Sequence, residues 1–228
     1  MPAFFREYEE FRGTGERNEL GETLDAFLEA YDPYRYKNPC ATTDTVVFTY
    51  EKEPVRDSVW RVLLIQRRNH PSIGLWALPG GFVELREDLI ETARRELAEE
   101  TGVEGLALEQ IGVYGKVRRD PRARVISTAY LAVTEAGTVR AAAGDDAKDA
   151  RWFRIRVEEE EGKGGARLFH LFLRDEAGEV KLRADLELRV RGDFVREEDI
   201  RTLSKEGIAG DHAEILLGAW RKLSERLS

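Results

Sequence analysis

Residues 88–102 constrain the fold of this chain more than any other stretch. Apolar side chains recur there at helical spacing, which predicts an amphipathic helix that packs its apolar stripe onto the rest of the protein. These side chains are Leu89, Ile90, Ala93 and Leu97. Asp88 and Glu91 occupy the positions of a capping box, and Gly102 suits the end of the helix. The segment therefore predicts a rigid helix with defined ends.

Three glutamates project from one flank of this predicted helix. At about 100° per residue, Glu99 and Glu100 lie three and four positions beyond Glu96 and point to the same side. Carboxylates this close repel one another unless a cation lies between them, and hard oxygen ligands favour Mg²⁺ or Mn²⁺ over zinc. Taken alone, such a run is more often a solvated acidic face, here paired with Arg94 and Arg95.

The wider segment, residues 81–103, resembles the Nudix box, the signature of the Nudix hydrolase family. That signature places a glycine and a glutamate ahead of Arg-Glu-apolar-x-Glu-Glu-x-Gly-apolar. The matching residues are Gly81, Glu87, Arg95, Glu96, Leu97, Glu99, Glu100, Gly102 and Val103. Every specified position matches, and a pattern of this length is specific. Arg86 departs from the glycine that many members have before the first glutamate, but this change removes no ligand.

The resemblance implies both a fold and a reaction. The fold is α/β (α+β), with a mixed β-sheet sandwiched between helices. Family members use water to break the P–O–P bond of a nucleoside diphosphate linked to another group X. The ligands of Mg²⁺ (or Mn²⁺) would be Glu96, Glu99, Glu100 and the backbone carbonyl of Gly81 or Gly80.

The resemblance also assigns the residues around the metal. Glu87 and Arg95 would pair and hold the glutamates in place. The general base stays open: Glu99 or Glu100 would serve, and so would an acid shortly before Trp152-Phe153, for which Asp146 is preferred over Asp145 and Asp149. An acidic turn is the alternative for this last group.

Candidate substrate contacts lie outside the box. Arg119 and Arg122 would each grip phosphate with two N–H groups, Arg67 would face X, and Tyr114 would stack on a base. The alternatives are solvated positions for the arginines and a core or interface position for Tyr114. The three histidines show no metal-ligand spacing to one another and are assigned no catalytic role; they are His70, His170 and His212.

Two outer segments favour one substrate class. Residues 119–130 and 211–216 resemble those of ADP-ribose pyrophosphatases and of the NAD-metabolism regulators called NrtR. ADP-ribose or a related nucleotide sugar is therefore the preferred substrate. The alternative is a regulator-like protein that senses ADP-ribose with little catalysis. In those regulators a winged-helix module follows and the box is often eroded. This sequence closes after one predicted helix and keeps the box intact, which favours an enzyme.

Composition is compatible with a compact cytoplasmic enzyme. The net charge of −8 disfavours a nucleic-acid partner. Cys40 is the single cysteine, so an intrachain disulfide is impossible. The start of the chain lacks the layout of a signal peptide, and apolar runs fall well short of the roughly 20 residues of a membrane span.

The pattern of elements predicts an N-terminal extension, residues 1–41, and a Nudix hydrolase domain, residues 42–228. Strands are expected at 43–50, 59–66, 111–117 and 124–133. Residues 156–228 form a C-terminal extension of the domain, with a charged loop, a hairpin and a helix. We expect these at 157–166, 167–189 and 212–227. Asp211 would cap the last helix, with Glu214 reaching back. The N-terminal extension and the hairpin are candidate contacts of a homodimer.

Overall fold

The structure is a computed structural model that describes residues 4, 7–144 and 147–227. The chain divides into two compact units, residues 1–38 and 39–228. The first unit holds a 3-10 turn, η1 (Glu9–Phe11), and the helix α1 (Leu24–Ala30). The Thr23 hydroxyl accepts a hydrogen bond from the backbone N–H of Ala26 (3.3 Å) and caps the start of this helix.

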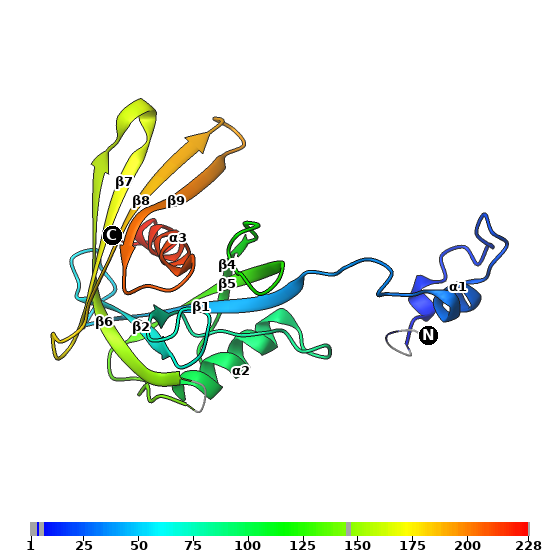
Figure 1. Cartoon of the computed structure of the whole chain (residues 1–228), viewed down its shortest axis with the longest axis horizontal. Helices are drawn as coiled ribbons and strands as arrows, with labels where there is room; N and C mark the ends of the chain where they lie inside the picture. The colour runs from blue at the N-terminus through cyan, green and yellow to red at the C-terminus, as the bar shows by residue number, and fades with distance from the viewer. Residues whose placement is uncertain (1–3, 5–6, 145–146, 228) are drawn as a thin grey trace. The chain divides into compact units, whose positions relative to one another are not determined.

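The second unit is built on one mixed sheet, which has nine strands within the described residues (Figure 1). The strands are β1 (Cys40–Tyr50), β2 (Trp60–Arg67), β3 (Trp76–Ala77), β4 (Glu109–Tyr114), β5 (Val125–Glu135), β6 (Ala147–Glu161), β7 (Arg167–Asp175), β8 (Lys181–Arg191) and β9 (Glu197–Glu206). Their order is β4-β5-β1-β2-β6-β7-β8-β9, with β3 beside β2. β1 and β5 run parallel, and the other pairs are antiparallel.

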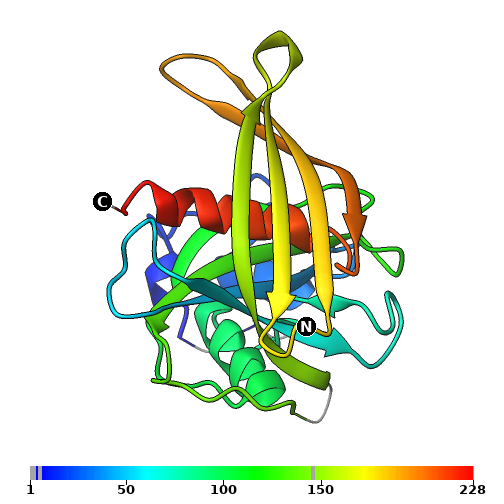
Figure 2. The same cartoon turned by 90° about the vertical axis from the view of Figure 1, so that its left-hand side faces the viewer.

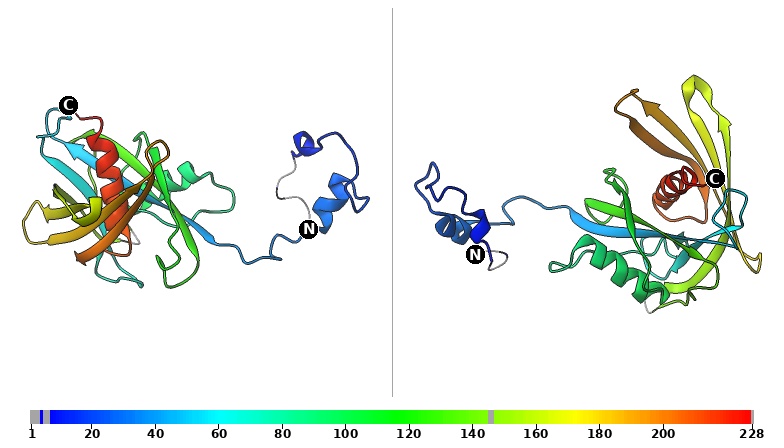
Figure 3. Two further views of the ribbon diagram at one scale, coloured as in Figure 1. Left: turned by 90° about the horizontal axis from the view of Figure 1, so that it is seen from above. Right: turned by 180° about the vertical axis from the view of Figure 1, so that it is seen from behind.

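Helices α2 (Leu89–Thr101) and α3 (His212–Ser224) cover opposite faces of this sheet (Figures 1 and 3). β1 alternates between the two cores, as side chains of a strand must. Its Val47 packs with Leu97 of α2, whereas Phe48 packs in the core that includes Leu216 of α3. Strands β6 to β8 run past α3 (Figure 2). This helix fills the concave side of the curled sheet. The expected mixed sheet between helices is confirmed.

Two expectations about the C-terminal half were wrong. The first half of the predicted loop at 157–166 is strand, because β6 continues to Glu161 in register with β7, and residues 162–166 form the connection between them. Its charged side chains point to solvent, where Arg167 pairs with Glu159 across the strands (2.5 Å). β9 was not predicted at all, since its charged sequence shows little apolar alternation. The predicted hairpin is present as β7 and β8, with the N–H of Gly178 donating to the carbonyl of Asp175 (3.0 Å).

Across residues 4, 7–144 and 147–227, every helix is too short or too polar to span a lipid bilayer.

Candidate active site

Helix α2 has the defined ends that its sequence predicts. The Glu91 carboxylate accepts a hydrogen bond from the N–H of Asp88 (2.9 Å) at the start of the helix. Gly102 ends it in the left-handed conformation (φ 68°), and its N–H donates to the carbonyl of Ala98 (2.8 Å). Because Ala93 and Leu97 are buried beneath it, the helix is a firm base for the acidic side chains on its flank.

Arg95 is the hub that orders these acidic side chains. Its guanidinium holds the two carboxylate oxygens of Glu87 at 2.7 and 3.0 Å. The same group donates to Glu96 at 2.8 Å and to Glu99 at 3.0 Å. It also reaches the carbonyl of Phe82 (3.2 Å), which ties the loop before the helix to the helix itself. The predicted pair of Glu87 and Arg95 is present, and hydrogen bonding to Arg95 lowers the pKa of Glu87.

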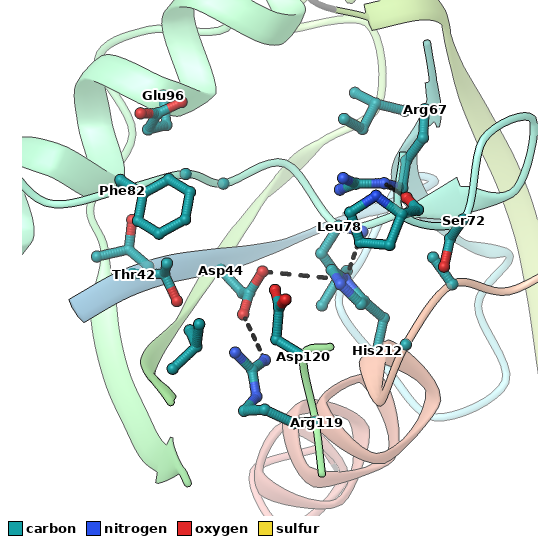
Figure 4. Close-up of a pocket in the computed structure, with 18 of the residues that line it drawn as sticks. Thr42, Asp44, Arg67, Ser72, Leu78, Phe82, Glu96, Arg119, Asp120 and His212 are labelled. Atoms are coloured by element: carbon teal, nitrogen blue, oxygen red, sulfur yellow. Dashed lines mark hydrogen bonds and ion pairs between the residues drawn. The ribbon is translucent and has the colours of Figure 1, made fainter. Parts of the chain in front are cut away.

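Glu96 and Glu100 line a cavity of about 670 Å³ that opens beside α2 (Figure 4). Glu100 accepts a hydrogen bond from the N–H of Gly80 (2.9 Å). Burial raises the pKa of Glu100 to about 8, and it also raises the pKa of Glu96. Two partly buried carboxylates therefore share one wall with no cationic side chain bound directly to Glu100 among the described residues.

This wall suits a hard divalent cation. All its donors are oxygens, and Thr43, a fully buried residue of the same cavity, has a hydroxyl without a hydrogen-bond partner among the residues that the structure describes. Gly81 leaves room for the Glu96 carboxylate, because a Cβ there would lie 2.4 Å from it. Within the described residues no three acidic, histidine or cysteine side chains converge on one point. The reason is that Arg95 turns Glu96 and Glu99 toward itself.

The structure brings three of the four predicted substrate contacts to this cavity. Arg67, Arg119 and Arg122 all line it. Arg67 donates to the carbonyl of Pro71 (2.7 Å). Arg122 pairs with Asp120 (2.8 Å) and lies 5.3 Å from the ring centre of Phe82, an exposed aromatic side chain on the rim. Sequence reasoning missed Phe82, although it stands next to the box glycine.

Tyr114 lies elsewhere. It lines a separate cavity between β4 and α3, and its hydroxyl lies against Gly218, where an added Cβ would be 2.5 Å away. Burial raises the pKa of Tyr114 to about 12. A core position was the alternative that the sequence analysis gave for Tyr114. Stacking of a base on Tyr114 within the Glu96 cavity does not fit the arrangement.

A buried ionic network forms the wall opposite the glutamates. Arg119 holds both carboxylate oxygens of Asp211 at 2.9 Å and reaches Asp44 at 3.3 Å. Ser127 also donates to Asp44 (2.5 Å). The predicted cap by Asp211 was therefore wrong. Its side chain makes no cap bond, because it is committed to Arg119. Glu214 does not reach back either and instead binds Lys116 (2.8 Å).

His212, which received no role from the sequence, belongs to this wall. The N–H of Leu78 donates to its Nδ1 (3.0 Å). An accepting Nδ1 carries no proton, so the proton of the neutral ring is on Nε2. Burial lowers the pKa of His212, in agreement with a neutral ring. The contact spans distant parts of the chain, so no local pattern could have revealed it.

The preferred general base, Asp146, and its neighbour Asp145 lie outside the described residues. Gly144 just before them donates its N–H to the carbonyl of Glu100 (3.0 Å). A Cβ on Gly144 would lie 1.7 Å from the carbonyl oxygen of Glu99, so glycine is required for this approach to α2. Asp149 is engaged by Arg151 (2.7 Å).

Two curated relatives align with the central part of the chain. An ADP-ribose pyrophosphatase from Methanocaldococcus jannaschii is 40% identical over 120 residues, which cover 53% of this chain and 64% of the relative. The ADPR responsive transcriptional repressor NtrR of Acinetobacter baylyi is 39% identical over 110 residues, which cover 47% of this chain and 42% of the repressor. The chain thus spans less than two thirds of the length of these relatives.

Solved structures extend the comparison. A MutT/nudix family protein from Enterococcus faecalis is 33% identical and matches 90% of this chain and 70% of its own, with a TM-score of 0.67. The NUDIX domain of Shewanella oneidensis NrtR, in a cocrystal with ADP ribose, is 35% identical and matches 58% of this chain and 84% of its own (TM-score 0.52). The family model of the NUDIX domain matches residues 42–172, more than half of the chain. On its box, its fold and this match, the chain belongs to the Nudix family.

Proposed function

We propose that this chain is a metal-dependent Nudix pyrophosphohydrolase. It cleaves the pyrophosphate bond of a nucleoside diphosphate linked to X, with ADP-ribose or a related nucleotide sugar as the substrate. The observation that carries the proposal is the wall formed by Glu96, Glu100 and Gly81, in a cavity whose other sides hold Arg67 and Arg122. The names of an aligned pyrophosphatase and of a ligand-bound NUDIX domain support ADP-ribose.

Glu96, Glu99, Glu100 and the carbonyl of Gly81 would hold Mg²⁺ or Mn²⁺. A bound divalent cation would neutralise charge on the diphosphate oxygens and acidify the attacking water. The Gly81 carbonyl already accepts one hydrogen bond, from the N–H of Thr43 (2.9 Å), and keeps a second lone pair. Arg95 positions the glutamates, because its other N–H groups are fixed on Glu87.

The remaining residues orient the substrate and handle its proton. Arg67 and Arg122 supply positive charge to phosphate oxygens at the rim of the cavity. The proton of the attacking water passes to a carboxylate, for which Glu99, Glu100 and Asp146 are the candidates. A homodimer formed through residues 1–41 or the hairpin, a cytoplasmic location and the absence of a nucleic-acid partner stay predictions from the sequence.

Hydrolysis should depend on the cation and discriminate between substrates. Wild-type protein is expected to release phosphate from ADP-ribose, after coupling to a phosphatase, and to lose this activity in EDTA. Added Mg²⁺ or Mn²⁺ should restore it. NADH, FAD, dinucleoside polyphosphates and nucleoside triphosphates form the comparison panel.

An ADP-ribose-sensing protein with little catalysis is the competing function, and the aligned repressor supports it. It predicts that ADP-ribose binds, measured by calorimetry, while every substrate in the panel stays intact with either metal. That outcome would overturn the enzyme assignment.

Two neighbouring glycines should separate stability from activity. A Cβ on Gly80 would lie 2.0 Å from the backbone oxygen of Thr43, so Gly80→Ala is expected to lower the free energy of unfolding by roughly 1–3 kcal/mol. At Gly81 the three atoms nearest to the added Cβ all belong to the carboxyl group of Glu96, the end of a flexible side chain. Gly81→Ala should keep its stability and lose about 10- to 100-fold in kcat/KM. Urea unfolding and steady-state kinetics measure both; full activity in Gly81→Ala would contradict the role of this contact.

A further inference from the structure

Asp44 and His212 lie close together in the wall opposite the glutamates (Figure 4). Asp44 is only 7% exposed, and both of its hydrogen bonds, from Ser127 and Arg119, end on Oδ2. Its Oδ1 accepts none from the described residues. The Nε2–H of His212 likewise has no partner in the described part of the chain. Nδ1 of the same ring lies 3.9 Å from Oδ1 of Asp44, and Nε2 lies across that ring, so the free donor is no more than about one imidazole width farther from this oxygen.

The charge of this wall selects the kind of group that binds there. Two carboxylates, Asp44 and Asp211, share the guanidinium of Arg119, which contacts Asp44 only through Oδ2 and leaves the Oδ1 carboxylate oxygen unpaired. The nearby ammonium group of Lys205 is turned to the carbonyl of Gly210. A phosphate would face the unpaired oxygen of Asp44 and be repelled. A hydroxyl group is neutral, and it both donates and accepts hydrogen bonds.

The backbone places this wall beside the metal-binding end of the cavity. The N–H of Gly80 holds Glu100, and the N–H of Leu78 holds His212. Two residues of extended chain span at most about 7 Å. The N–H groups of Leu78 and Gly80 therefore lie no farther apart than the length of one chemical group of the substrate. A sugar attached to a diphosphate that is held by a cation at Glu96 and Glu100 would meet His212 next.

We propose that Asp44 and His212 form a subsite for the vicinal hydroxyls of a ribose attached to the diphosphate. Oδ1 of Asp44 accepts a hydrogen bond from one hydroxyl, and Nε2–H of His212 donates to the oxygen of its neighbour. Arg119 is a positioning residue, which holds the Asp44 carboxylate in place. This assignment rests on the proposed function and specifies which part of the substrate each wall recognises.

His212→Asn is the decisive variant. The asparagine oxygen occupies the place of Nδ1 and can still accept from the N–H of Leu78, whereas the donor at Nε2 is lost. A purely structural histidine therefore predicts little change. Asp44→Asn tests the acceptor of the proposed subsite, because it keeps the shape of the side chain and removes its negative charge. Unfolding in urea checks that both variants stay folded.

The measurement is kcat/KM for three substrates: ADP-ribose, its analogue lacking a hydroxyl on the adenosine ribose, and the analogue lacking one on the terminal ribose. We expect each variant to lose about 10- to 100-fold with ADP-ribose and much less with one of the analogues. The analogue with the smaller loss identifies which of the two riboses binds at Asp44 and His212. If the wild type binds without turnover, Kd replaces kcat/KM.

Three results would overturn the subsite. The first is an unchanged kcat/KM for ADP-ribose in both variants, and the second is an equal loss of kcat/KM for all three substrates. The third is a wild-type kcat/KM that is the same for ADP-ribose and for both analogues. Wild-type protein that neither binds nor hydrolyses ADP-ribose would overturn the proposed function, and the ribose assignment with it.

Discussion

Glu100→Gln is expected to lower kcat for ADP-ribose by roughly 10²–10³-fold, the size of effect seen when one group that stabilises transition-state charge is removed. Glutamine keeps an oxygen that accepts the N–H of Gly80, so the loop before α2 stays in place. What is lost is the negative charge that holds the cation. The same reasoning applies to Glu96, which is partly buried in the same wall, and to Glu99.

The matched control for these variants is Glu104→Gln. Glu104 is an exposed acid just after the same helix and does not line the cavity of Glu96 and Glu100. It should retain wild-type kcat and KM. Raising the Mg²⁺ or Mn²⁺ concentration should partly restore the box variants and leave the control unaffected. Near-normal turnover in both Glu99→Gln and Glu100→Gln would remove these side chains from the metal site.

Arg119→Met is expected to lower the free energy of unfolding by about 3–5 kcal/mol, because it leaves two buried carboxylates without their cation. Asp44 and Asp211 lose the partner that holds them at 3.3 and 2.9 Å, and methionine supplies no hydrogen bond in return. Urea denaturation measures the change as a shift in midpoint at constant slope.

Arg122→Met is the comparison for this prediction. Arg122 is more exposed and pairs with a single carboxylate, Asp120, so its replacement should cost no more than about 1 kcal/mol. Adding Asp44→Asn to Arg119→Met removes one of the two unpaired negative charges and should recover part of the lost free energy of unfolding. If Arg119→Met unfolds at the same urea concentration as the wild type, the network does not support the wall.

The network also explains how the cavity depends on distant segments. Asp44 comes from β1, Arg119 from the connection between β4 and β5, and Asp211 from the start of α3. The N–H of Trp76 donates to the carbonyl of Gly207, and that of Ala209 donates to the carbonyl of Trp76, both at 2.8 Å. These bonds fasten the segment before α3 to the loop that carries Gly80. Loss of Arg119 should therefore weaken substrate binding as well as stability.

The box and its helix could be predicted from the sequence because their interactions are local. Glu96, Glu99 and Glu100 share a flank through helical spacing alone, and Glu91 caps within one turn. Glu87 lies before this helix, and its pairing with Arg95 was predicted from the family resemblance and not from helical spacing. The hairpin of β7 and β8 was likewise predicted, since one turn sets its register.

Tertiary structure alone decided the other wall and the edges of the sheet. Asp211 looks like a cap in the sequence, but a buried guanidinium 92 residues away binds it more strongly than a backbone N–H would. The N–H of Leu78, 134 residues away, fixes the tautomer of His212, and burial favours its neutral form by lowering its pKa. β9 exists because β8 offers it a ladder of backbone partners. Such contacts depend on burial and on which segments the fold brings together, and neither is encoded in the spacing of neighbouring residues.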